Sequence, residues 1–328
     1  MVKTSITFGY DVYAWYARRS LRDYYLDREA AWEINEVARQ RIGETFGWQV
    51  GVKMPYLAYA SLTALGVEIS YPEDGQPMIT RPIVGSPADL ESLPRVRDVM
   101  TSGAMPHLID LWKYLCDREG EEVPLSLGNE GPITASVLVR GVDFLVDVLE
   151  NREFAHRLLS AVANLFVETN RGCQTVLGKP LSGGTKGMAD DFAGLLAPAQ
   201  YREFVVPYYN RIYGSLGADR RDLHSELLHP DHLPMLAEFK LNHFDPHTDQ
   251  YLTVRDMVER MPRGISWNWR ILSASVVTGT PEGLAREFED AAADGATDFL
   301  VFISAPVKPE NVRAVAELAA HHGTLTVT

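Results

Sequence analysis

Apolar and polar positions alternate with different periods along this chain, and the changes of period mark out helices and strands. In residues 151–177, apolar side chains recur every three or four positions, which predicts a long amphipathic helix. From residue 123 onwards, short apolar runs alternate with further helical stretches as far as residue 321. This alternation is typical of a parallel sheet whose strands are joined by crossover helices.

The order of these elements predicts an α/β fold, a (β/α)8 barrel of the TIM type. We expect strands in residues 123–127, 181–187, 221–224, 241–244, 264–269 and 299–303. Polar residues follow most of these strands, as they do at the C-terminal rim of a parallel barrel, where the chemistry takes place. The glycine-rich fingerprints of dinucleotide and nucleoside-triphosphate sites are absent from the sequence. One domain spanning residues 1–328 is the economical interpretation.

Two segments precede the regular part of the chain. Residues 1–48 are rich in aromatic residues and arginine, and we expect them to form a helical N-terminal extension that covers the barrel. Residues 66–84 contain two β-type runs around a Pro-Glu-Asp-Gly turn, which predicts a small β-hairpin.

Composition narrows the classes of function. The chain has 31 Lys and Arg against 44 Asp and Glu, and this net charge of −13 argues against a nucleic-acid or anionic membrane partner. Two cysteines, Cys116 and Cys173, are too few for a Cys-rich metal site and fit a reduced, cytoplasmic protein. The N-terminus lacks the apolar core of a signal peptide, and no apolar run is long enough to span a membrane.

The strongest candidates for chemistry lie at the ends of two neighbouring strands. His224 and Glu226 are two positions apart, so on a strand they share one face and can reach a common metal ion or substrate. A zinc site would need a third ligand, for which His247, Asp249 and Glu130 all remain open. Without a metal, Glu226 would act as a general base oriented by His224.

The next strand ends in Asp245, with His247 two residues later. Both are candidate substrate contacts, although either could instead structure the loop. Trp267 and Trp269 flank this region two positions apart, with Arg270 beside them. They could form a flat ligand wall with a guanidinium for a carboxylate or carbonyl group, or two tryptophans could simply pack in the core.

Polar residues also follow the two earlier strands. Asn129 and Glu130 lie in a Gly-Pro turn, where Glu130 could serve as a base or as a metal or substrate contact, or could merely be solvated. Lys186 precedes the adjacent carboxylates Asp190 and Asp191. Two adjacent carboxylates cannot easily point into one pocket, so we expect one to be functional and the other to cap a turn.

Several short motifs, taken in order, resemble the uroporphyrinogen decarboxylase superfamily, which includes methyltransferases that exchange methyl groups with corrinoid proteins. They lie at residues 64–68, 82–94, 131–136, 190–198, 204–208, 223–225, 279–282 and 308–312. The resemblance implies a (β/α)8 barrel, in agreement with the periodicity.

Departures from the family's motifs bear on function. The Arg-Gln-Ala-Gly-Arg segment with which the decarboxylases grip porphyrinogen carboxylates is missing. The zinc-dependent methyltransferases carry His-x-Cys and a second, distant Cys; here His224 matches the histidine, but Glu226 replaces the first cysteine and Ser304-Ala305 lies near the place of the second. The chain is more similar to members that pass methyl groups between a corrinoid and tetrahydrofolate.

The resemblance therefore implies a methyltransferase that moves a methyl group between a small molecule and a corrinoid protein. The small molecule would be tetrahydrofolate or a methoxy- or methylamine-type compound undergoing demethylation, and zinc remains open as a cofactor. An alternative is a decarboxylase or lyase of a carboxylated substrate, and a third is a barrel that binds without catalysis. Expected catalytic residues are His224, Glu226, Asp191 and Glu130; expected substrate contacts are Asn129, Lys186, Asp190, Asp245, His247, Trp267, Trp269 and Arg270.

Overall fold

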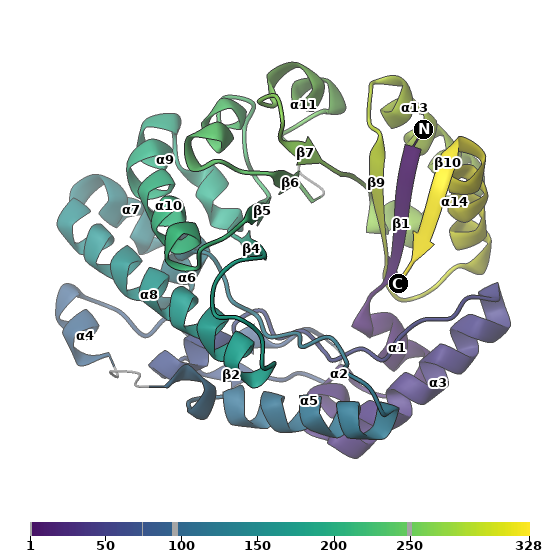
Figure 1. Cartoon of the computed structure of the whole chain (residues 1–328), viewed down its shortest axis with the longest axis horizontal. Coiled ribbons are helices and arrows are strands. Elements are labelled where there is room, and N and C mark those ends of the chain that lie inside the picture. The colour runs from purple at the N-terminus through teal and green to yellow at the C-terminus, as the bar shows by residue number, and fades with distance from the viewer. Residues whose placement is uncertain (1, 74, 94–97, 248–250) are drawn as a thin grey trace.

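A computed structural model describes residues 2–73, 75–93, 98–247 and 251–328. Two four-stranded parallel sheets face each other around a common centre, with helices on the outside (Figure 1). One sheet has the order β4 (Thr185–Ala189), β5 (Arg220–His224), β6 (His243–Asp245), β7 (Ser266–Trp267). The other has the order β10 (Gly323–Val327), β1 (Val2–Phe8), β9 (Asp298–Ile303), β8 (Trp269–Ile271).

These two sheets form the wall of a (β/α)8-type barrel. Only Asn268 separates β7 from β8, so one short segment joins the sheets on one side. On the other side, the wall continues through single parallel bridges between Glu130 and Ala189 and between Leu57 and Leu127. The expected strand in residues 123–127 is thus reduced to a bridge, because Pro124 has no N–H with which to extend a ladder.

The helical layer contains the predicted long helix as α8 (Arg152–Val176), whose apolar face is buried. The remaining helices of the layer are α4 (Pro87–Ser92), α5 (Met105–Glu119), α6 (Pro132–Arg140), α7 (Asp143–Glu150), α9 (Pro198–Phe204), α10 (Val206–Ser215), α11 (Val254–Arg260), α12 (Ser273–Thr278), α13 (Pro281–Ala293), α14 (Pro309–His322) and the 3₁₀ turns η1 (Ala60–Leu65), η2 (Val99–Thr101), η3 (Asp191–Leu195) and η4 (Leu233–Phe239). None of the described helices combines the length and apolar character needed to cross a membrane.

The N-terminal extension is helical only in part. Helices α1 (Tyr10–Ala17), α2 (Leu21–Leu26) and α3 (Arg28–Phe46) form the expected cover. Residues 2–8, however, form β1, which pairs with β9 on one side and β10 on the other. The prediction of an entirely helical extension was wrong because Thr4, Ile6 and Phe8 alternate with more exposed residues, which is the period of a strand. Strand β10 was not predicted either.

The predicted hairpin is confirmed. Strands β2 (Ile69–Ser70) and β3 (Met78–Ile79) are antiparallel, with Ile69 opposite Ile79. Asp74, in the expected turn, lies outside the described residues. The strand expected within residues 181–187 is displaced to β4, because Gly183 and Gly184 adopt positive φ angles and turn the chain before the strand begins.

One buried amide fixes the segment before Leu57 to the helical cover. The Asn35 side chain on α3 is fully buried, accepts a hydrogen bond from the Lys53 backbone N–H (2.7 Å) and donates one to the Lys53 carbonyl (3.0 Å). Tyr24 also donates to that carbonyl, at 2.7 Å. Side-chain hydrogen bonds therefore replace a sheet ladder at this position.

We predict that Asn35→Ala lowers the free energy of unfolding by about 3 kcal/mol, because it leaves the Lys53 N–H without its partner and removes one of the two donors to the Lys53 carbonyl. Urea denaturation monitored by circular dichroism measures the change. Arg41→Ala, on an exposed part of the same helix, is the control and should alter stability by less than about 0.5 kcal/mol. Equal stability of the two variants would contradict the assigned role of Asn35.

Candidate active site

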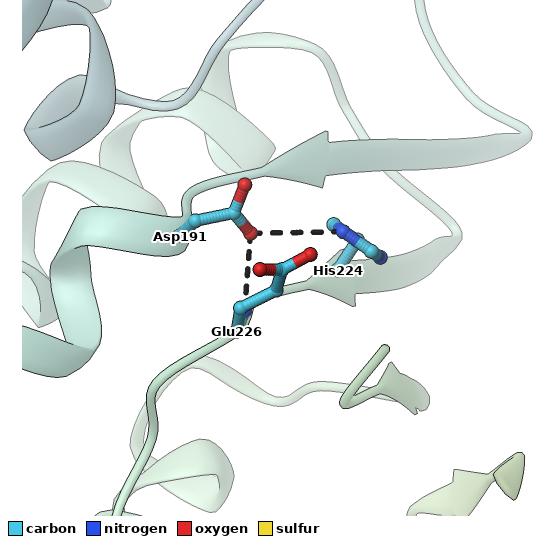
Figure 2. A group of neighbouring side chains, drawn as sticks. All are labelled: Asp191, His224 and Glu226. Atoms are coloured by element: carbon cyan, nitrogen blue, oxygen red, sulfur yellow. Dashed lines mark hydrogen bonds and ion pairs between the residues drawn. The ribbon is translucent and has the colours of Figure 1, made fainter. Parts of the chain in front are cut away.

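Three side chains from two adjacent strand ends converge at the rim of the barrel. Asp191 begins η3 two residues after the end of β4, His224 ends β5, and Glu226 follows two residues later (Figure 2). The Asp191 carboxylate accepts the backbone N–H of Glu226 at 3.0 Å and lies 3.6 Å from Nε2 of His224. Potential ligand atoms of the three residues all lie within 4.8 Å of one another. The sequence predicted all three as catalytic residues, but it named His247, Asp249 and Glu130 as candidates for the third ligand, and the structure places Asp191 there instead.

Asp245 at the end of β6 orients the His224 ring. Its Oδ2 lies 2.9 Å from Nδ1 of His224. Because an ionised carboxylate can only accept, Nδ1 donates its proton to Asp245, and Nε2 faces Asp191. The ring is therefore oriented so that Nε2 points to the group formed by Asp191 and Glu226.

Asp245 is in turn fixed by Arg270 and Asn268. Arg270 Nε and Asn268 Nδ2 donate hydrogen bonds to Oδ1 of Asp245 at 3.1 and 3.0 Å. The Nη2 group of Arg270 donates to Oδ2. Burial alone would raise the Asp245 pKa, but the hydrogen bonds from His224 and Arg270 outweigh it and hold the pKa well below its usual range. Arg270 is thus occupied within the protein, contrary to the expectation that it contacts a substrate.

Asn268 and His243 are site residues that the sequence reasoning missed. His243 Nε2 lies 3.0 Å from Asn268 Oδ1, and this contact fixes the amide that holds Asp245. The alternation of strand side chains could have identified Asn268 as a site residue, since it lies two positions from Arg270 and so shares its strand face.

His247 supports Glu226. Its Nδ1 lies 2.7 Å from Glu226 Oε1, and this hydrogen bond, ahead of the opposing effect of burial, lowers the Glu226 pKa. Glu226 is therefore ionised at neutral pH and suited to act as a base or a ligand. Asp249, another ligand candidate, lies outside the described residues.

Glu130 has the opposite electrostatic environment. It is 8% exposed, and burial followed by repulsion from Asp191 and Asp190 raises its pKa well above the usual value. Its Oε2 is buried and has no hydrogen-bond partner among the described residues. Glu130 lines a cavity of about 450 Å³ together with Asp191 and His224. Burial also raises the pKa of Asp191, so two carboxyl groups with raised pKa values face this cavity.

Asp190 is structural. It is fully buried and accepts the backbone N–H groups of Ile133 and Thr134, at 3.1 and 2.7 Å, at the N-terminus of α6. Burial raises its pKa to about 6, against the effect of these hydrogen bonds. Its expected role as a substrate contact is wrong, because the carboxylate is enclosed where the helix end attracts it. Asp191 is the member of the pair that faces the cavity.

Lys186 faces the helical layer. It pairs in register with Arg221, whose guanidinium hydrogen bonds the carbonyl of Phe239 outside the barrel. Register neighbours in parallel strands point to the same side of the sheet, so Lys186 cannot line the interior. The expected contact between Lys186 and a substrate is therefore wrong.

Trp267 and Trp269 also face the helical layer. They pair with Phe244 and Phe299, which are fully buried, while the intervening Asn268 points inward. The packing interpretation therefore holds, and the expected ligand wall is wrong.

A second cavity of about 480 Å³ lies beside the first, within the barrel. Asn129, His224, His243 and Asp245 are among its lining residues. The Asn129 amide also donates to the Phe166 carbonyl at 3.0 Å. Neither of these two cavities has a lysine or arginine among its described lining residues.

We predict that Asp245→Asn lowers the free energy of unfolding at neutral pH by about 3 kcal/mol, because it leaves the partly buried Arg270 without its counter-charge. The folded-state pKa of Asp245 is depressed, so this contribution is complete above the unfolded pKa of about 4 and is lost as the pH falls further. Urea denaturation at pH 7 and pH 3 measures it. A stability difference between the two proteins that does not shrink on acidification would contradict this assignment.

Comparisons with known proteins give a family and a fold. The sequence model for "Uroporphyrinogen decarboxylase (URO-D)" matches residues 16–261. A solved structure of a methyltransferase from Methanosarcina mazei superposes with a TM-score of 0.75 at 17% sequence identity, covering 98% of this chain and 94% of that one. At this identity the similarity establishes a shared fold. A search of curated proteins finds no match.

Proposed function

Because the chain belongs to the uroporphyrinogen decarboxylase (URO-D) family, we propose that it is the methyltransferase of a corrinoid-dependent system. It would transfer a methyl group between a small molecule in the barrel mouth and a corrinoid carried by a partner protein. The fold shared with a solved methyltransferase supports this proposal. The corrinoid would supply the cobalt that accepts or donates the methyl group.

The charged side chains that line the two rim cavities favour methyl transfer over decarboxylation. A decarboxylase must hold a substrate carboxylate at its reacting centre, and arginine is the side chain best suited to bind a carboxylate. The described linings offer carboxylates and histidines there but no lysine or arginine, and Arg270 is paired with Asp245. Such a mouth favours a neutral or cationic reacting group, such as a methyl group on oxygen or nitrogen, over a carboxylate.

The protonation states of the site suit methyl transfer from a heteroatom. When the methyl group leaves, an electron pair stays on the oxygen or nitrogen, and that atom becomes a better leaving group if it receives a proton. Glu130 holds a proton on a carboxyl group with a free oxygen. In the reverse direction, Glu130 would take the proton back.

The rim offers a surface for a partner. Leu195, Tyr251 and Leu272 are large apolar residues that follow β4, β6 and β8, and each is more than 40% exposed. Their position around the mouth supports docking of the protein that carries the corrinoid.

The Asp191, His224 and Glu226 group also fits a zinc ion. An imidazole with two carboxylates is an accepted zinc ligand set, and a carboxylate on the far nitrogen of the histidine is its usual support, as Asp245 provides. A bound zinc ion would act as a Lewis acid toward the methyl-bearing heteroatom. Without zinc, Glu226 and His224 would orient and deprotonate the substrate directly.

We predict that Glu130→Gln reduces methyl transfer about 100-fold, because the amide cannot give up a proton. The assay follows methylcobalamin formation from cob(I)alamin by absorbance, with methyltetrahydrofolate and a panel of methoxy compounds and methylamines as donors. The wild-type rate should fall as the pH rises through the raised Glu130 pKa, and this decline should disappear in the variant.

The same assay tests the function itself. Release of CO2 from uroporphyrinogen without methyl transfer to cobalamin from any donor would favour the decarboxylase. Glu238→Gln, a surface carboxylate on η4, is the matched control and should retain the wild-type rate.

We also predict one zinc ion per chain in protein purified without chelators, measured by elemental analysis. Glu226→Ala and His224→Ala should each lose most of the metal, because each removes a ligand. Glu121→Ala, an exposed carboxylate remote from this group, should retain it. Metal-free wild-type protein that transfers methyl groups would instead assign Glu226 and His224 to direct acid–base work.

A further inference from the structure

His243 lies on the inner face of the barrel wall, deeper than the reacting groups. It begins β6, two residues before Asp245, so the two side chains share one strand face. It lines the cavity of about 480 Å³ together with His224 and Asp245. Both of its ring nitrogens have a polar neighbour: Ser266 Oγ lies 2.9 Å from Nδ1, and Asn268 Oδ1 lies 3.0 Å from Nε2.

The Asp245 carboxylate determines which atom donates in the contact between Asn268 and His243. Burial alone would raise the Asp245 pKa, but hydrogen bonds from His224 and Arg270 hold it well below its usual range, so its oxygens only accept. Asn268 therefore directs its NH2 group at Oδ1 of Asp245, at 3.0 Å. The other end of that amide is a carbonyl oxygen, which can only accept, and it faces Nε2 of His243. Nε2 of His243 must carry a proton.

Nδ1 of His243 has no such restriction, because its neighbour is a hydroxyl group. Ser266 Oγ also lies 3.1 Å from the Asn242 carbonyl. The hydroxyl can donate to that carbonyl when Nδ1 carries a proton, and to Nδ1 when it does not. The carbonyl also accepts the Ser266 backbone N–H, at 2.9 Å, so it keeps a partner in either case. His243 can thus gain or lose a proton at Nδ1 while Nε2–H remains bonded to Asn268.

Charged groups of both signs surround the His243 ring. Asp222 is its register neighbour on β5 and pairs with Arg220 at 2.9 Å. Asp298 on β9 is near enough to interact with it electrostatically: burial raises the Asp298 pKa, and the charges of His243 and Lys3 oppose this rise. In this setting, the hydrogen bond from Nε2 to Asn268 is the contact that does not depend on the charge of the ring.

We propose that His243 is a positioning residue that acts on His224 through a directed series of hydrogen bonds. Nε2–H of His243 holds the Asn268 carbonyl in both charge states of the ring. The Asn268 amide holds Asp245, which accepts Nδ1–H of His224. With donors and acceptors fixed in this order, Nε2 of His224 stays directed at Asp191. The effect on catalysis rests on the proposed function, whereas the proton positions do not.

Nuclear magnetic resonance of the full chain with isotope-labelled histidine tests the proton positions without any methyl-transfer assay. We expect Nε2 of His243 to carry a proton throughout the range from about pH 5 to pH 8, with any titration confined to Nδ1. The signals that disappear in His243→Gln assign the ring. A His243 ring that carries its proton on Nδ1 and none on Nε2 anywhere in this range would overturn the proposal.

His243→Gln and His243→Met separate the hydrogen bond from the space that the ring fills. The glutamine amide can donate from about the position of Nε2, whereas methionine has a similar size and no side-chain N–H. We expect the Nδ1–H resonance of His224 to persist in His243→Gln and to shift or disappear in His243→Met, because Asn268 then lacks the donor that orients its amide. If His243→Met does not fold, His243→Asn replaces it, since its shorter amide reaches only toward Ser266. An unchanged His224 resonance in that variant would contradict the positioning role.

The same variants test the effect on catalysis in the methyl-transfer assay. We expect His243→Met to lower kcat about tenfold or more with little change in KM, because loss of an outer hydrogen bond disorders the reacting group. His243→Gln should restore most of the wild-type kcat. Ser266→Ala, which removes only the contact at Nδ1, is the control and should keep it. A rise in KM with an unchanged kcat in His243→Met would instead make His243 a substrate contact.

The outcomes separate this inference from the proposed function. A proton on Nε2 of His243 and a His224 resonance that depends on it, without methyl transfer from any donor, would retain the positioning role and refute the methyltransferase. Methyl transfer with the same kcat in the wild-type protein and in His243→Met would retain the methyltransferase and refute the positioning role.

Discussion

The bond network around Asp245 is the constraint on which the rest of the site depends. One carboxylate receives Arg270, Asn268 and the Nδ1 proton of His224, so three strands of the barrel wall meet at a single charge. Its strength comes from partial burial, where an ion pair is screened less than at the surface. Because Arg270 is paired with Asp245, it is not available to a substrate. Because Nδ1 of His224 is also bonded to Asp245, Nε2 is the ring nitrogen that faces the cavity.

The site also shifts the pKa values of two of its carboxyl groups in opposite directions. Burial and repulsion from Asp191 and Asp190 raise the Glu130 pKa well above its usual value, whereas the hydrogen bond with His247 lowers the Glu226 pKa. Pairs of titratable groups with divergent pKa values are the usual means by which one pocket performs acid and base chemistry at one pH. Here the opposite pKa shifts of Glu130 and Glu226 follow from the strand end that each residue occupies and from how deeply that end is buried.

The sequence predicted the barrel and the strand ends better than it predicted side-chain direction. Period and order located His224, Glu226 and Asp245, since parallel strands bring their carboxyl ends to one rim. The predicted side-chain direction was wrong at Lys186, Trp267 and Trp269. A shift of one residue sends a strand side chain to the other face, and no local feature of the sequence showed which residues face inward. Burial of Asp190 depended on the N-terminus of α6, more than 50 residues earlier in the chain. Such contacts exist only after folding.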